Sequence, residues 1–266
     1  METKNYKELD FTSNFMFCKI LYNNPDVCRQ LLEMILKRKV RKIEYLAAEE
    51  PVEITSDARG IRMDVYLEDD TDTVYDIEMQ TTVNSELPKR TRYYQGMIDL
   101  NLIERGADFE ELRKTYVIFI CLKDPFDRGS SIYTFENRCL EYSDLAMGDD
   151  AFKVFLNAAG DKSRIPEELA GFLDYLTGQP PKNAFTKKLD ELLQQAREHK
   201  QWEVEYMTLA MQYREKYKEG LAEGRAETRI ETLIELIKAG AEKSILLQVY
   251  TEEEYAKAEA KVYNLA

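Results

Sequence analysis

The sequence contains a single histidine, His199, among 266 residues. This excludes a zinc site of the HExxH kind and argues against any catalytic triad that needs histidine as its base. The four cysteines, Cys18, Cys28, Cys121 and Cys139, are scattered and form no CxxC pair. We therefore expect neither a zinc site nor a disulfide framework. Chemistry in this chain has to come from carboxylates, amides, lysines or hydroxyls.

Long hydrophobic runs are also missing, since no apolar stretch approaches the roughly 18–20 residues that span a bilayer. The N-terminal segment METKNYKELDFTSNF lacks the apolar stretch of a secretory signal. We expect a cytoplasmic protein with no membrane segment. Positive charge is scarce as well, because 37 lysines and arginines face 50 acidic residues and the net charge is −13. This balance argues against broad nucleic-acid binding but leaves room for a local basic groove.

The apolar patterns predict an α/β fold. Residues 11–38 have helical spacing with Pro25 in a first turn, and helical spacing returns at 87–105. The run TYVIFICL at 115–122 predicts a strand buried on both faces, and residues 131–142 predict a further strand. This order implies a mixed sheet flanked by helices.

The composition changes after about residue 180. Pro180-Pro181 is followed by a long stretch that contains no proline and is rich in Glu, Lys, Ala, Leu and Gln, which favour helices. We therefore expect a core domain at residues 1–180 and a C-terminal helical extension at residues 181–266.

The segment GLAEGRAE within this extension is a four-residue near-repeat. It puts Gly220 and Gly224 on one helix face and Ala222 and Ala226 on another. Two interpretations remain open, namely a solvated helix and a helix that packs closely against a second copy in a homo-oligomer.

Residues 61–80 predict a β-hairpin. Two β-prone runs, IRMDVYL and TVYDIEMQ, flank a connector rich in aspartate and threonine. Successive side chains on a strand alternate between faces. With a turn centred on Thr71, three apolar pairs then face each other: Met63–Met79, Val65–Ile77 and Leu67–Tyr75.

The same register places Asp64 opposite Glu78, with Asp76 and Gln80 beside it. Directly opposed residues have Cβ atoms about 5 Å apart, so two carboxylates there repel unless a cation compensates them. A divalent cation with oxygen ligands does so, and the register therefore predicts a metal site. The alternative is the solvated face of an amphipathic hairpin, and a slip of one residue would separate the two acids.

The strings DARGIRMDVYLEDDTDTVYDIEMQ and KRTRYYQGMIDLNLIERGADFEELRKTYVIFICL resemble the PD-(D/E)XK nuclease family transposases, also called the Rpn family of recombination-promoting nucleases. The resemblance extends from Asp10 to about Tyr175. It implies a restriction-endonuclease-like core and Mg²⁺-dependent hydrolysis of DNA phosphodiesters, with Mn²⁺ or Ca²⁺ as other ions for the site. It also implies a role in recombination or mobile elements.

The resemblance gives roles to three residues of the hairpin. Asp64 and Glu78 match the metal-binding acids, and Gln80 stands where many members of the wider superfamily have lysine. Gln80 could orient a water molecule as a catalytic residue but carries no positive charge. Met63 precedes Asp64 where the superfamily has proline. The other interpretation is a catalytically degenerate nuclease fold that serves as a DNA- or protein-binding module.

Members of the superfamily often add an acid from the first helix. Glu33 is the candidate for this third metal ligand, and its alternative is a solvent-facing residue on an amphipathic helix. Asp57 and Asp76 are spare acids of similar standing.

Cations and aromatic residues open the helix that follows the hairpin. They are candidates for contacts with a DNA backbone: Lys89, Arg90, Arg92 and Tyr94. The alternative is an amphipathic helix whose tyrosines pack on the sheet. We favour packing for Tyr93 and a phosphate contact for Arg90.

Overall fold

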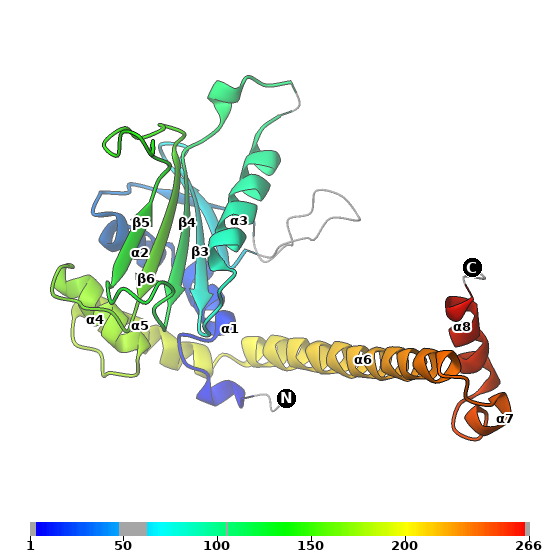
Figure 1. Ribbon diagram of the computed structural model, residues 1–266. Coiled ribbons are helices and arrows are strands. Elements are labelled where there is room, and N and C mark those ends of the chain that lie inside the picture. The colour runs from blue at the N-terminus through cyan, green and yellow to red at the C-terminus, as the bar shows by residue number, and fades with distance from the viewer. Residues whose placement is uncertain (1–3, 48–62, 105, 264–266) are drawn as a thin grey trace. The chain divides into compact units, whose positions relative to one another are not determined.

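The computed structural model describes residues 4–47, 63–104 and 106–263. Six strands within these residues form one mixed sheet in the order β1-β2-β3-β4-β6-β5 (Figure 1). β3, β4 and β6 run parallel to one another, and the outer strands join them in antiparallel pairs. The strands are β1 (Ile43–Ala47), β2 (Val65–Asp69), β3 (Val74–Gln80), β4 (Thr115–Cys121), β5 (Ile132–Phe135) and β6 (Ala151–Asn157).

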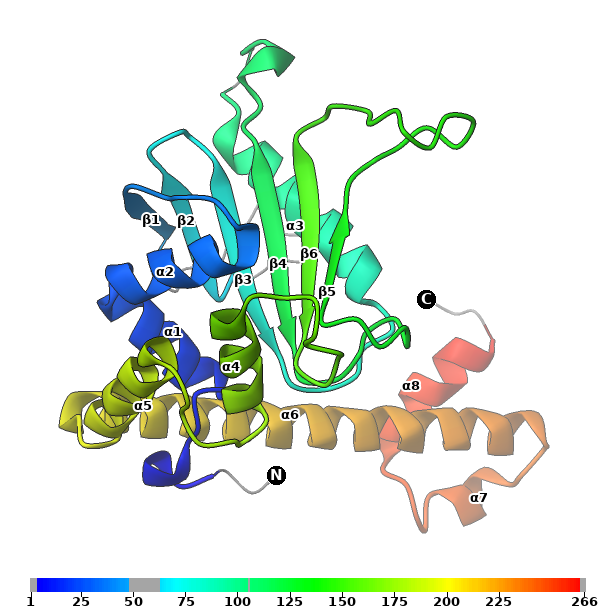
Figure 2. The same cartoon turned by 90° about the vertical axis from the view of Figure 1, so that its left-hand side faces the viewer.

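Helices cover both faces of the sheet, which confirms the predicted α/β fold (Figure 2). α3 lies on one face and contacts β4, whereas α1, α2 and α4 lie on the other face. Two short 3₁₀ turns, η1 (Tyr6–Glu8) and η2 (Phe109–Glu111), complete the first part of the chain. The helices there are α1 (Asn14–Asn23), α2 (Pro25–Leu36), α3 (Leu87–Leu102), α4 (Glu167–Leu176) and α5 (Ala184–Arg197).

The central strand β4 is buried on both faces, as the run at 115–122 predicts. Val117 and Phe119 pack toward α3 in a cluster that includes Met97 and Ile98 of that helix. Ile118 and Ile120, which alternate with them along the strand, are also fully buried. A parallel strand covered by helices on both sides needs apolar residues along its length, and β4 meets that requirement from Val117 to Cys121.

Two strands differ from the sequence-based expectation. The strand expected at 131–142 is confirmed only for Ile132–Phe135, and the chain after it forms an irregular loop with one isolated bridge, between Arg138 and Ala146. β6 was not predicted, because Lys153 interrupts its apolar pattern. Pairing with β4 on one side and β5 on the other nevertheless fixes β6 as a strand.

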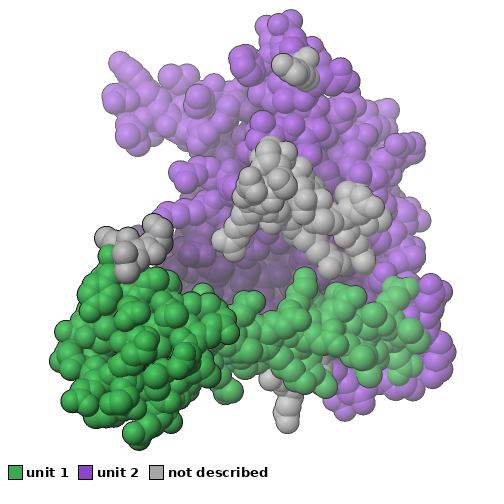
Figure 3. Space-filling view, turned by 90° about the vertical axis from the view of Figure 1, so that its right-hand side faces the viewer, with its two compact units in different colours: residues 1–3, 203–266 green, residues 4–202 purple. Residues whose placement is uncertain are grey.

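The compact unit that contains the sheet extends from Lys4 to Trp202, beyond the boundary expected at residue 180 (Figure 3). The reason is α5, which follows Pro180-Pro181 but buries Phe185, Leu189 and Leu193 within this unit. Burial of each of these side chains contributes about 1.5–3 kcal/mol to the free energy of folding. The amphipathic face of α5 therefore belongs to the core.

The second unit begins at Glu203 and is helical throughout most of the residues described. It contains most of α6 (Lys200–Lys238), together with α7 (Lys243–Leu246) and α8 (Glu252–Val262). Leu233 of α6 packs with Leu246, Tyr255 and Ala258, and this small cluster holds the three helices together. Every helix in the described part of the chain is too short or too polar to cross a bilayer.

Candidate active site

The pairing of β2 with β3 has the register that the apolar residues predict. Val65 lies opposite Ile77 and Leu67 lies opposite Tyr75. The third expected pair is wrong, because Met63 precedes the first residue of β2 and packs in the cluster on the α3 side of the sheet. The alternation of faces holds only where the backbone is a regular strand.

Asp64 and Glu78 meet through two reciprocal hydrogen bonds. The Asp64 main-chain N–H donates to Glu78 Oε1 at 3.0 Å, and the Met79 N–H donates to Asp64 Oδ2 at 3.0 Å. Both acidic side chains are buried. Each carboxylate is thus fixed by the main chain of the other strand, which holds two like charges side by side.

Asp76 adds a third acid beside this pair. It is fully buried, and neither of its carboxylate oxygens has a hydrogen-bond partner among the described residues. Burial and the negative charge of Asp64 raise the pKa of Asp76 well above its usual value. Burial and the charges of Asp76 and Asp64 likewise raise the pKa of Glu78. Burying a carboxylate without a partner is costly, so these acids favour their protonated forms unless positive charge is brought beside them.

A single cation from α3 reaches the acids. Arg90 Nη2 lies 3.5 Å from Glu78 Oε2, and Arg90 Nη1 donates to Gln80 Oε1 at 3.0 Å. The same guanidinium donates to the Tyr94 hydroxyl at 2.9 Å and lies over the rings of Tyr94 and Phe119. Arg90 is therefore held in place by a carboxylate, an amide, a phenol and two aromatic faces.

The first helix supports the site from the other side. The Asn14 side-chain amide donates to Asp64 Oδ1, and the Cys18 thiol donates to the Asp64 main-chain oxygen at 3.2 Å. Asn14 begins α1 and lies fifty positions before Asp64. Sequence reasoning missed Asn14, since only a polar residue at the start of a helix marked it.

A model of the PD-(D/E)XK nuclease family transposases matches residues 7–144, which is more than half of the chain. The chain belongs to this family. The match covers the hairpin, α1, α2, α3 and β4. No curated protein and no solved structure matches the chain. The family expected from the motifs is confirmed, and it gives the chain a nuclease-related function.

A nuclease of this family is expected to use a divalent metal, and the acids of the hairpin suit one. Among the described residues, no three acidic, histidine or cysteine side chains are grouped so that they would surround one ion. Mg²⁺ does not require such a cage, because it commonly binds through one or two carboxylates and retains several waters. Asp64 and Glu78 supply two carboxylates, and the oxygens of the neighbouring Asp76 have no hydrogen-bond partner among the described residues.

The structure does not bring Glu33 to these acids. Its carboxylate accepts a hydrogen bond from the Val40 N–H at 3.0 Å and forms ion pairs with Arg29 and Lys39. Although burial opposes it, the Val40 N–H and Lys39 hold the pKa of Glu33 below its usual value. Glu33 therefore fixes the chain after α2, and we leave it out of the metal site. Asp57 lies outside the described residues.

The cations and tyrosines at the start of α3 divide into two groups. Lys89 and Arg92 are exposed, as is Tyr93 with 39% of its surface accessible. Tyr94 is only 7% exposed and packs on the sheet beneath Arg90. The preference for packing at Tyr93 is wrong, because the helical turn points Tyr94 inward instead.

We predict that Asp76→Asn stabilises the metal-free protein, and more so at pH 8 than at pH 5. The pKa of Asp76 is raised by folding, so its stability contribution is favourable at low pH and is lost as pH rises above its unfolded value. The amide does not ionise, and at pH 8 the gain should exceed about 1 kcal/mol. Thermal unfolding in a chelator measures this, with Asp70→Asn at the exposed turn as control. Equal pH dependence in wild type and Asp76→Asn would contradict the prediction.

Proposed function

We propose that this protein is a Mg²⁺-dependent DNA endonuclease that acts in recombination or in mobile elements. The observation that carries the proposal is the pair Asp64 and Glu78, held together and buried beside Asp76. Keeping these carboxyl groups close and buried lowers the stability of the fold, an arrangement that is typical of functional sites. Membership of the nuclease family supplies the substrate class.

Asp64 and Glu78 would hold the metal, and their neighbours would fix their orientation. Asn14 and the Met79 N–H each donate to one oxygen of Asp64, which fixes the orientation of its carboxylate. When bound there, Mg²⁺ polarises the phosphodiester and favours deprotonation of the attacking water. Glu78 Oε1 accepts from the Asp64 N–H, so the main chain beside one proposed ligand orients the carboxylate of the other.

Gln80 and Arg90 would together take the role of the lysine found at this position in many members of the superfamily. The Gln80 amide donates to the main-chain oxygen of Thr82 at 2.8 Å, and its oxygen accepts from Arg90. The amide of Gln80 carries no charge, but the guanidinium that it positions is positively charged. We infer that Arg90 stabilises the negative charge that builds on the phosphate in the transition state. Lys89 and Arg92, exposed on the same helix, would contact neighbouring phosphates.

We expect Asp64→Ala and Glu78→Ala to reduce plasmid nicking in Mg²⁺ by at least about 100-fold. Each variant removes a metal ligand and also relieves repulsion, so the fold should remain intact. Nicking rates with and without divalent metal measure the effect, and circular dichroism checks the fold. Asp70→Ala, at the exposed turn of the same hairpin, is the matched control.

If both variants nick as wild type does, the site assignment is wrong. Calorimetry with Mg²⁺ or Mn²⁺ distinguishes an active nuclease from a catalytically degenerate nuclease fold. A degenerate nuclease fold that only binds DNA or protein should show no metal binding that depends on Asp64.

Arg90→Ala should lower the nicking rate by about 100-fold, which is typical for loss of one electrostatic donor in a transition state. Adding Gln80→Lys to this variant should then raise the nicking rate at least about tenfold, because lysine at position 80 places a positive charge on β3 itself. Rates at saturating DNA, melting temperatures and Mg²⁺ affinity are measured for each variant. Loss of melting temperature in Arg90→Ala without rescue by Gln80→Lys would assign Arg90 a structural role.

We also propose that α6 mediates assembly of a homo-oligomer. Tyr213, Tyr217 and Leu221 are exposed at four-residue intervals and so share a helix face, beside Gly220 and Gly224. A Cβ placed at either glycine would meet nothing within 4 Å. Each glycine costs the helix about 1 kcal/mol relative to alanine, and no packing within the described part of one chain offsets that cost.

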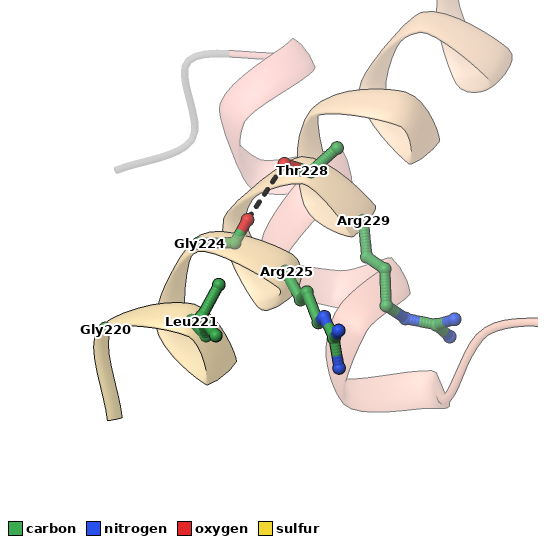
Figure 4. Close-up of a pocket in the computed structure, with 6 residues that line it drawn as sticks. All are labelled: Gly220, Leu221, Gly224, Arg225, Thr228 and Arg229. Carbon is green, nitrogen blue, oxygen red and sulfur yellow. Dashed lines mark hydrogen bonds between the residues drawn. The ribbon is translucent and has the colours of Figure 1, made fainter. Parts of the chain in front are cut away.

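A depression on α6 marks the same place (Figure 4). It is lined by the two glycines, Leu221, Arg225, Thr228 and Arg229, and the Thr228 hydroxyl donates back to the Gly224 oxygen at 2.8 Å. Helices approach closely where such small residues face a partner. A second copy of α6 is therefore the occupant that we propose.

Replacement of both Gly220 and Gly224 by alanine distinguishes the two interpretations of this helix. If α6 is solvated, the substitutions stabilise it by about 1 kcal/mol each and leave the mass in solution unchanged. We expect the assembly to weaken instead, because the methyl groups would hold the two helices apart. Light scattering over a range of concentrations measures the mass, and a chain that ends at Trp202 provides the monomer reference.

A further inference from the structure

Basic residues are concentrated in one short segment of this acidic chain. Five of the six residues 37–42 are lysine or arginine, although acidic residues outnumber basic ones 50 to 37 in the whole sequence. The segment joins α2 to β1. We call it the basic loop.

The basic loop borders a hollow on the surface of the sheet-containing unit. The hollow has a volume of about 660 Å³, and four of its lining residues are basic: Arg29, Lys37, Arg38 and Lys39. Glu33 and Glu168 are the acidic residues in its lining. The lining therefore has a net positive charge in a protein with a net charge of −13.

Only some of these cations are neutralised within the chain. Arg38 is paired with the buried Asp69 at 3.1 Å, and Lys42 is paired with Glu44. Lys37 and Arg41 are exposed and form no ion pair with any residue that the structure describes. The Lys39 side chain is 90% exposed despite its ion pair with Glu33. Lys37 and Arg41 thus lack an ion pair within the described structure, and Lys39 keeps most of its surface accessible to an external anion.

The helix dipole explains part of this arrangement but not all of it. Lys37 ends α2 with a φ of 54°, a left-handed conformation that usually favours glycine or asparagine. A cation at that end of a helix gains about 0.3–1 kcal/mol from the macrodipole. Arg41 lies beyond the helix, so the macrodipole does not account for its charge.

The basic loop lies at the opposite end of the hairpin from the acids. Ile43 of β1 pairs with Asp69 at the end of β2, whereas Asp64 precedes the start of β2. Five strand residues separate the two ends by about 17 Å. That distance corresponds to about five base pairs along a duplex.

We propose that Lys37, Lys39 and Arg41 bind backbone phosphates of double-stranded DNA at a site separate from the acidic pair. The proposal rests on the proposed function for its choice of polyanion. Phosphate contacts of this kind give affinity and register without reading sequence. They would also offset the repulsion between DNA and the acidic surface of the protein.

The test is the salt dependence of duplex binding by the full-length chain. Fluorescence anisotropy with a labelled 30-base-pair duplex is measured in a chelator, so that no cleavage occurs. The variant combines Lys37→Gln and Arg41→Gln, which remove charge while keeping long polar side chains. The matched control combines Lys187→Gln and Lys188→Gln, two exposed residues of α5.

The loop variant should bind about tenfold more weakly, and its slope of log affinity against log salt should fall by about 1.8, since each phosphate contact contributes about 0.9. The control should keep the slope of wild type. An equal change in both variants, no change in either, or no duplex binding by wild type would overturn the proposal. A loss of self-association with duplex affinity unchanged would also overturn it and assign the surface to a protein partner.

The plasmid-nicking assay separates this proposal from the proposed function. If wild type nicks DNA but the loop variant binds as wild type does, only the role of the basic loop is wrong. If wild type does not nick but the loop variant loses its salt slope, the phosphate site stands without the nuclease.

Discussion

The reciprocal hydrogen bonds between Asp64 and the strand of Glu78 determine the rest of the acidic site. They hold two carboxylates at a distance that electrostatic repulsion opposes, and Asp76 adds a third acid with no partner in the described structure. Such an arrangement lowers the stability of the fold, so burial of the surrounding apolar layers has to offset this loss of stability. Buried β4 and the helices on both faces of the sheet provide that support.

Positive charge reaches these acids from a different element of the fold. Gln80 follows Glu78 on β3 but carries no charge, whereas Arg90 enters from α3 and is oriented by Gln80 itself. The chemistry of a site depends on which groups reach a point in space, not on the strand that carries them. A cation that is absent from β3 can therefore reach the same acids from a neighbouring helix.

The register of the hairpin could be predicted from the sequence, because the alternation of apolar residues around Val65 and Ile77 is a local property. Contacts between distant segments carry no comparable signal. Asn14 reaches Asp64 across fifty positions, and α5 joins the core although two prolines precede it. Glu33 shows the converse, since an acid in an apolar helical run looks like a ligand but binds the chain after its own helix.

The first and last segments of the sheet-containing unit close on each other. The Tyr6 hydroxyl donates to the main-chain oxygen of Ala196, and the Arg197 side chain donates to that of Leu9. A folded unit whose two ends meet can be spliced into another polypeptide, or joined to a different tail, without distortion of its interior. The fold of this unit therefore places no constraint of its own on the helices that follow Trp202.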